Sequence, residues 1–279
     1  MSVPTGSATD ALADVRRVRV HHLRAAKDRG ERWAMLTAYD AQVARLFDQA
    51  GIPVLLVGDS VGTTVLGRAT TVGVTVEEMA LFGAAVAGAV HRALVVVDLP
   101  FGSYESGPAQ ALATSVALMK RTGAGAVKLE GGASRAASVA ALVDAGIPVM
   151  GHVGFTPQHE HALGGYRVQG RGAAGEQVAA DATALAAAGA FAVVLEMVPG
   201  EVATRVSAAL DIPVVGIGAG AGTDAQVLVW TDLVGLTGGR VPSFVRRYAE
   251  LGAGLTDAVR RYAADVADGE FPGAAETFD

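Results

Sequence analysis

One phrase occurs twice in this chain and restricts the fold more than any other feature. Residues 123–130 read GAGAVKLE, and residues 189–196 read GAFAVVLE. Each phrase follows Ala-rich sequence of helical character and holds a short apolar run that ends on a carboxylate, which is typical of a buried parallel strand. The glycine that opens each phrase suits the left-handed position that closes a helix. The repeat therefore predicts a recurring helix-to-strand unit.

Strand-like and helical runs alternate along the rest of the chain. The expected strands are 33–38, 54–57, 94–97, 126–129, 147–151, 192–195, 213–217 and, more weakly, 232–236. Helices are expected to start at Asp40, at Thr75 with Glu78 completing a capping box, at Ser134, and at Thr223 or Asp224. The tripeptide Ile-Pro-Val occurs three times and places a proline at the start of three strands, where its missing N–H is harmless.

Eight β/α units in one domain predict an α/β fold, a single closed (β/α)8 TIM barrel. An open doubly wound sheet is the alternative, but the number of units and the lack of a polar edge strand favour closure. Residues 1–20 read as a flexible N-terminal lead. Residues 21–279 are expected to form one barrel domain with a C-terminal helix and tail.

The composition excludes several classes of function. The chain of 279 residues is 51% hydrophobic and has no cysteine, so it has neither a disulfide framework nor thiolate chemistry, and a cytoplasmic location is the default. Its net charge of −6 comes without a basic cluster, which argues against nucleic acid as a partner. The apolar runs are of strand length, which argues against a membrane span.

Polar side chains follow five consecutive predicted strands. They are Asp59 with Ser60, Asp98, Glu130, His152 and Glu196. All C-terminal strand ends of a barrel face one mouth, so these groups should converge on one pocket. Each carboxylate alone is also explained as a helix N-cap, but that explanation is poor for all five positions together. Several like charges in one mouth need a cation, and oxygen ligands without cysteine favour Mg²⁺ over Zn²⁺.

Lys128 is one of only three lysines, and it lies inside a predicted strand two residues before Glu130. Strand alternation places both side chains on the same face, toward the barrel interior. A buried structural salt bridge is one interpretation. Binding of an anionic substrate group is a second, and a Schiff-base role is a third that the nearby carboxylates disfavour.

Three other stretches have two interpretations each. GIGAG at 216–220 is a tight turn or a phosphate cradle, and without an adjacent Lys or Arg the turn is favoured. His152 is a metal ligand or, as a lone strand-end histidine more often is, a hydrogen-bond partner of a carboxylate or substrate. The glycine-rich connection 164–175 is expected to be a mobile functional loop, whereas His159-Glu160-His161 beside it reads as solvated surface.

Several motifs, in order, resemble the ketopantoate hydroxymethyltransferase family. They are LTAYD (36–40), LLVGDSVG (55–62), DLPFGSY (98–104), AVKLEGG (126–132), GHVGFTPQ (151–158), GGYRVQGRG (164–172), VLEMVP (194–199) and GIGAG. The resemblance implies a Mg²⁺-dependent barrel of the phosphoenolpyruvate/pyruvate superfamily type. It also implies transfer of a one-carbon unit from 5,10-methylenetetrahydrofolate to 3-methyl-2-oxobutanoate, which gives 2-dehydropantoate in pantothenate biosynthesis.

The same resemblance assigns roles by matching motif. Asp59, Asp98 and Glu130 hold or surround the metal, Ser60 and Lys128 contact the keto acid, and Glu196 is the base. A homo-oligomer of decamer type is also implied. The chain departs from the family pattern at Gly73, at Thr223 and Ala225, and near its C-terminus, which bears on folate affinity and assembly.

Two alternative functions remain. A related metal-dependent C–C lyase or mutase would be expected to carry a loop cysteine, and a non-enzymatic barrel would be expected to lack one of the four acids.

Overall fold

Eight parallel strands close into a barrel. The structure is a computed structural model that describes residues 11–239 and 241–278. The strands pair in chain order, and β1 pairs with β8 to close the ring. They are β1 Trp33–Thr37, β2 Val54–Val57, β3 Leu94–Asp98, β4 Ala126–Glu130, β5 Val149–Gly154, β6 Ala192–Glu196, β7 Val214–Ile217 and β8 Ala225–Leu228. The predicted closed barrel is confirmed, and the open-sheet alternative is wrong.

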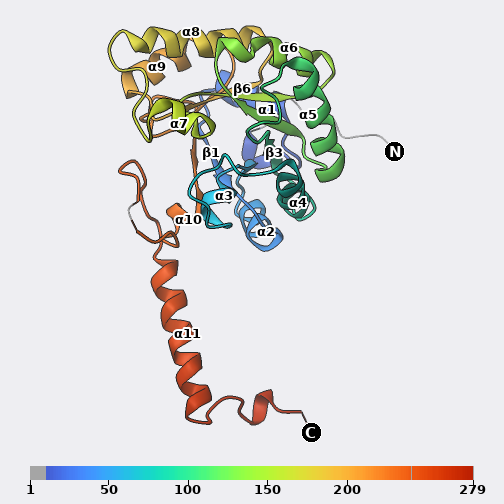
Figure 1. Cartoon of the computed structure of the whole chain (residues 1–279). Helices are drawn as coiled ribbons and strands as arrows, with labels where there is room; N and C mark the ends of the chain where they lie inside the picture. The colour runs from blue at the N-terminus through green and yellow to red at the C-terminus, as the bar shows by residue number, and fades with distance from the viewer. Residues whose placement is uncertain (1–10, 240, 279) are drawn as a thin grey trace. The chain divides into compact units, whose positions relative to one another are not determined.

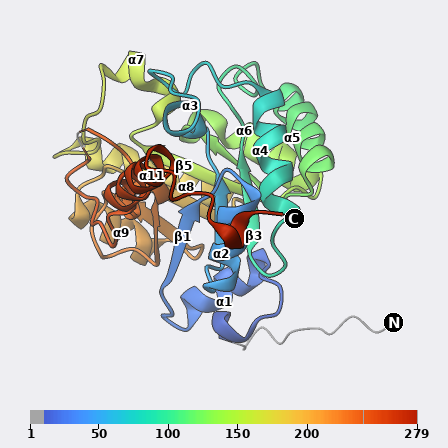
Figure 2. The same ribbon diagram turned by 90° about the horizontal axis from the view of Figure 1, so that it is seen from below.

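Helices surround the strands, as Figures 1 and 2 show. Their bounds are α1 Val20–Asp28, α2 Ala41–Gln49, α3 Val61–Thr64, α4 Val76–Ala87, α5 Pro108–Thr122, α6 Ala136–Asp144, α7 Glu160–Leu163, α8 Ala174–Ala187 and α9 Gly200–Ala209. Short 3₁₀ turns lie at η1 Leu12–Asp14, η2 Ala133–Arg135 and η3 Pro157–His159. The connection 218–224 between β7 and β8 contains no helix.

Local sequence signals account for most of the element boundaries. The Asp40 side chain accepts hydrogen bonds from the N–H groups of Gln42 and Val43, and Thr75 forms the predicted capping box with Glu78. Gly123 ends α5 in the left-handed conformation at φ 74°. Ser134 differs from expectation, because a 3₁₀ turn precedes α6 and Asp181 of α8 accepts the hydrogen bond from Ala133 N–H.

The eighth strand is not where the sequence predicted it. Residues 225–228, expected as a helix after Thr223 or Asp224, form β8, whereas the expected strand 232–236 overlaps the helix α10 Trp230–Leu233. The reason lies in the AQVL run. It alternates buried and more exposed side chains and pairs with both β7 and β1. The run is too short for its periodicity to distinguish a strand from a helix, so pairing with these two strands determines its structure.

The N-terminal segment packs against the barrel core. Residues 1–10 of the expected lead lie outside the described residues. Leu12, Val15 and Val18 are buried in one apolar cluster with interior side chains of the strands. Arg92, just before β3, donates hydrogen bonds to the carbonyls of Leu12 and Val15. The described part of this segment is therefore packed against the barrel, and the flexibility expected of residues 1–20 stays a prediction.

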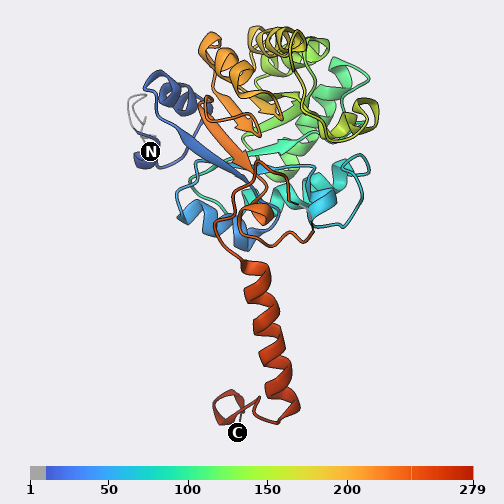
Figure 3. The same cartoon turned by 90° about the vertical axis from the view of Figure 1, so that its left-hand side faces the viewer.

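Val229–Asp279 forms a second compact unit. It contains α10, the long helix α11 Leu251–Ala267 and the short turn η4 Ala274–Glu276. Figure 3 shows α11 as one uninterrupted helix. Among the described residues, no helix combines the length and the apolar character that crossing a bilayer requires.

Candidate active site

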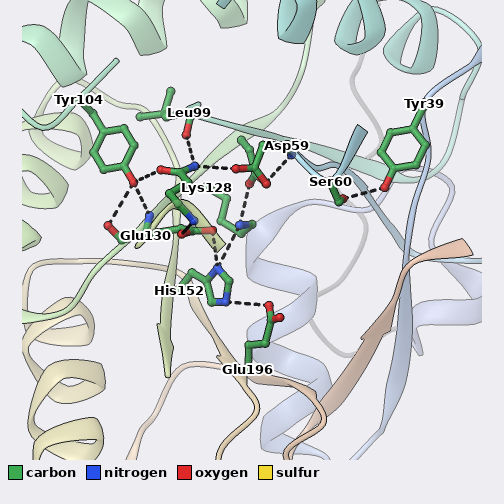
Figure 4. A network of polar contacts seen from close by, with 11 residues as sticks. Tyr39, Asp59, Ser60, Leu99, Tyr104, Lys128, Glu130, His152 and Glu196 are labelled. Carbon is green, nitrogen blue, oxygen red and sulfur yellow. Dashed lines mark hydrogen bonds and ion pairs between the residues drawn. The ribbon is translucent and has the colours of Figure 1, made fainter. Parts of the chain in front are cut away.

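The barrel interior changes from apolar to charged along β3 and β4. On β3 the inward row reads Leu94, Val96, Asp98, and on β4 it reads Ala126, Lys128, Glu130. Because successive side chains point to opposite faces, every second residue faces the interior, and the charged ones come last. The strands thus bring the predicted polar residues together at the C-terminal mouth, where Figure 4 shows them as one network of contacts.

Asp59 and Ser60 lie directly after β2. Asp59 is buried, and its N–H donates a hydrogen bond to Asp98 Oδ2 over 3.1 Å. Burial, together with repulsion from the carboxylates of Glu130 and Asp98, raises the pKa of Asp59 to about 7. Ser60 Oγ is 2.7 Å from the hydroxyl of the buried Tyr39, so the serine hydroxyl is held at the edge of the carboxylate group.

Lys128 and Asp98 form a buried ion pair, with 2.9 Å between Nζ and Oδ1. Burial alone would lower the pKa of Lys128, but the combined charge of Asp98, Glu130 and Asp59 outweighs it, so this pKa lies above its ordinary value. Burial raises the pKa of Asp98, and Lys128 opposes that shift. The lysine is therefore a protonated ammonium, which suits charge pairing and makes it a poor Schiff-base nucleophile.

His152 lies between two carboxylates. Its Nδ1 is 3.3 Å from Glu130 Oε1, and its Nε2 is 3.2 Å from Glu196 Oε2. Burial and the charge of Lys128 would lower the pKa of His152, but Glu130 and Glu196 outweigh them and raise it to about 9. Burial raises the pKa of Glu130, but the nearby His152, the charge of Lys128 and the Gln158 N–H outweigh it, so this pKa is lowered. The imidazole of His152 therefore connects the carboxylate that ends β4 to the carboxylate that ends β6.

Two residues that the sequence reasoning did not select belong to the same network. Gln158, in η3 after β5, donates from Nε2 to Asp59 Oδ2 over 3.0 Å and from its backbone N–H to Glu130 Oε2 over 3.0 Å. Tyr104, in the loop after β3, donates its hydroxyl to Gln158 Oε1 over 2.5 Å. Both occur in motifs noted above, DLPFGSY and GHVGFTPQ, but neither stands at a strand end, which was the signal used.

The carboxylates fit a cation only as part of a larger ligand set. Among the described residues, no three His, Asp or Glu side chains are grouped closely enough to hold a metal ion by themselves. Asp98 Oδ1 and Glu130 Oε1 are buried, however, and accept no hydrogen bond from the described residues, although Lys128 and His152 are their ionic neighbours. Mg²⁺ is commonly held by one or two carboxylates with substrate oxygens and water. Asp59, Asp98 and Glu130 fit that pattern.

Other predicted stretches lie outside this network. His159 Nδ1 is paired with Thr156 Oγ1 at 3.1 Å, and His161 is exposed. GIGAG forms a turn in which Gly218 and Gly220 have positive φ, as favoured from the sequence. In the glycine-rich loop, Tyr166 packs on Phe155, with ring centroids 4.7 Å apart. The mobility of this loop stays a prediction.

Met197, directly after Glu196, has a left-handed backbone at φ 48°, unlike any other non-glycine residue that the structure describes. Its N–H donates to Ile217 O over 2.8 Å, and its carbonyl accepts the Gln169 N–H over 2.9 Å. These two bonds join the end of β6 both to β7 and to the glycine-rich loop. Residues in such conformations persist where the surroundings over-determine them, often at functional sites.

Comparison with solved structures supports the barrel fold. The barrel resembles a phosphonopyruvate hydrolase solved with oxalate and Mg²⁺, at TM-score 0.58 and 15% identity over 92% of each chain. It also resembles 2,3-dimethylmalate lyase, described as a PEP mutase/isocitrate lyase superfamily member, at TM-score 0.57 and 17% identity over 93% of this chain and 91% of that one. These likenesses show the fold, a closed (β/α)8 barrel.

Sequence comparison is more specific. The chain is 59% identical over 278 residues to a 3-methyl-2-oxobutanoate hydroxymethyltransferase of Saccharopolyspora erythraea, covering 100% of this chain and 94% of that protein. It is 56% identical over 265 residues to the protein of that name from Corynebacterium glutamicum, covering 95% and 98%. The sequence model named ketopantoate hydroxymethyltransferase matches residues 17–274. The chain therefore belongs to the ketopantoate hydroxymethyltransferase family.

Proposed function

We propose that this enzyme transfers a hydroxymethyl unit from 5,10-methylenetetrahydrofolate to 3-methyl-2-oxobutanoate and so forms 2-dehydropantoate for pantothenate biosynthesis. One observation carries the proposal beyond family membership. The side chains of Asp98 and Glu130 are 3% and 1% exposed, whereas that of Glu196 is 14% exposed. Carboxylates in different environments take different roles, so the more accessible Glu196 suits proton abstraction and the buried acids suit cation binding.

The residues divide the chemistry between them. Glu196 accepts the proton from the carbon beside the ketone, and the imidazolium of His152 at 3.2 Å holds its carboxylate in place. The ammonium of Lys128 and the hydroxyl of Ser60 bind the negatively charged end of the keto acid. Asp59, Asp98 and Glu130 would hold Mg²⁺, which supplies a Lewis acid that stabilises negative charge on the keto oxygen as it forms.

The proposal extends to the setting of the enzyme. A homo-oligomer is expected by resemblance to the family. A reducing compartment such as the cytoplasm is compatible with a chain that contains no cysteine. The same lack of cysteine disfavours a lyase or mutase that needs a loop thiol, which was the alternative activity for this barrel.

A direct assay tests the proposed function. The purified protein should form 2-dehydropantoate from 3-methyl-2-oxobutanoate and 5,10-methylenetetrahydrofolate with Mg²⁺, and EDTA should abolish product formation until Mg²⁺ is restored. Asp98→Asn should lose the Mg²⁺ response, whereas Asp181→Asn on α8, outside the mouth, should keep it. Lack of product with Mg²⁺, or full activity in EDTA, would overturn the proposal.

A further inference from the structure

Gln158 uses both N–H donors and the carbonyl oxygen of its side chain in hydrogen bonds inside the mouth. It is 3% exposed. Its Nε2 donates to Asp59 Oδ2 over 3.0 Å and to Leu99 O over 2.9 Å, and its Oε1 accepts the Tyr104 hydroxyl over 2.5 Å. An amide has two N–H donors and one carbonyl, so no donor is left unused. A buried amide satisfied in this way is held in one orientation.

The orientation of the amide follows from its partners. The carbonyl of Leu99 can only accept a hydrogen bond, so the atom 2.9 Å from it must be the nitrogen. The same nitrogen must then face Asp59, which places a donor against a carboxyl oxygen. The Tyr104 hydroxyl is itself fixed, because the N–H of Glu130 donates to it over 3.2 Å. The Leu99 carbonyl thus determines which atom of Gln158 meets Asp59, and the Tyr104 hydroxyl held by the backbone of β4 agrees with that assignment.

The backbone of Gln158 reaches a second carboxylate. Its N–H donates to Glu130 Oε2 over 3.0 Å. Gln158, which follows β5, therefore contacts groups from three other strands. They are Asp59 after β2, the Leu99 carbonyl after β3 and Glu130 at the end of β4. Asp98 Oδ1 and Glu130 Oε1, beside these contacts, are buried carboxylate oxygens that accept no hydrogen bond from the described residues.

We propose that Gln158 is a positioning residue for the cation site. Its amide holds Asp59 Oδ2 and its N–H holds Glu130 Oε2, so both acids are oriented before cation and keto acid arrive. Partners that orient metal-binding carboxylates typically contribute 10- to 100-fold to metal affinity. The presence of the cation rests on the proposed function. The orientation of Asp59 by Gln158 does not depend on the cation, because it follows from their hydrogen bond.

The test replaces the amide with an apolar side chain of similar length. Gln158→Met should weaken Mg²⁺ binding, titrated by calorimetry with 3-methyl-2-oxobutanoate present, by roughly 10- to 100-fold. A crystal structure of the variant without metal should show the Asp59 carboxylate rotated away from its present position. At saturating Mg²⁺ most of kcat should return, because Gln158 does not touch Glu196. The control is Gln226→Met, which removes another amide that makes two hydrogen bonds, to Gly220 O and Thr223 Oγ1, outside the mouth.

A double substitution separates positioning from a general loss of structure. If Gln158 acts through Asp59, adding Gln158→Met to Asp59→Asn should weaken Mg²⁺ binding little further, whereas independent effects would add. Should Gln158→Met not fold, Tyr104→Phe removes only the hydroxyl that fixes the amide and should weaken binding roughly 3- to 10-fold.

The outcomes distinguish this inference from the proposed function. An unmoved Asp59 with unchanged Mg²⁺ affinity in the Gln158 variant would overturn the inference and leave the proposed function standing. If the unsubstituted protein bound neither Mg²⁺ nor keto acid, the proposed function would fail. The position of Asp59 in the metal-free variant would still decide the role of Gln158.

Discussion

Single residues at the mouth of the barrel differ in what their replacement should do. Glu196→Gln keeps the shape of the side chain and can still contact His152, but an amide cannot accept the proton. We expect Mg²⁺ and keto acid to bind normally while kcat falls by roughly two to four orders of magnitude. The readout that needs no folate is exchange of the C3 proton of 3-methyl-2-oxobutanoate for deuterium, followed by NMR.

Glu201→Gln is the matched control for that experiment. Glu201 is an exposed acid in the first turn of α9, five residues beyond Glu196, and its replacement should leave exchange unchanged. If Glu196→Gln exchanged the proton at the unsubstituted rate, the base would be another group. His152, at 3.2 Å, would then be the first candidate.

The sequence predicted which acids meet, but not what holds them. Asp59, Asp98 and Glu130 each end or follow a strand, and strand ends of a barrel converge whatever the loops do. Gln158 and Tyr104 reach the same point from a 3₁₀ turn and an irregular loop, and their positions depend on tertiary packing that no local periodicity records. Gln158 follows Pro157 in a loop, and its distance in sequence from the preceding strand did not indicate that its side chain enters the mouth. Its amide was recognisable only once its three partners were in place.

At the scale of elements, the same contrast separates β8 from the other strands. Seven strands were predicted within a few residues of their bounds, because each is a continuous apolar run flanked by helical sequence or an Ile-Pro-Val entry. The AQVL run lacked both signals, since no helix separates it from β7. What makes it a strand is the pairing of Trp33 with Ala225 and of Met35 with Val227, a contact across nearly two hundred residues that local sequence does not encode.

At Met197, directly after β6, glycine should be more stabilising than alanine, the opposite of the usual order. Left-handed φ at Met197 penalises any side chain with a Cβ. We therefore expect Met197→Gly to be more stable to urea than Met197→Ala by about 1 kcal/mol. In the exposed part of α8 the order should reverse, with Ala180→Gly about 0.5–1 kcal/mol less stable than the unsubstituted protein. Greater stability of the alanine variant at 197 would contradict the strained conformation.

For the whole molecule, the buried charges predict how stability depends on pH. His152 has a pKa of about 9 when folded and about 6.5 when unfolded, so its stabilisation is complete below the lower value and is lost as pH rises through the upper one. The raised pKa of Asp59, about 7, lowers stability as pH rises from about 4 to 7, so most of its effect lies below the range in which His152 acts. Between pH 7 and 9.5 the free energy of unfolding in EDTA should fall by about 2 kcal/mol.

Urea unfolding across that range checks the prediction, with His152→Gln as the comparison. This variant has no group that titrates there at position 152, so its stability should change little between pH 7 and 9.5. Parallel curves for the two proteins would show that His152 is not the source of the pH dependence.

Closure of the barrel by β8 has a consequence for how the chain is made. Glu196 ends β6, whereas the strand that joins β1 to β7 is complete only at Leu228. A nascent chain therefore carries every proposed site residue before it can seal the ring, and in that interval β1 and the last finished strand present unpaired backbone N–H and C=O groups. A chain that folds during synthesis would thus pass through an open sheet whose two exposed edges can pair with other chains, and the four residues of β8 would end that exposure.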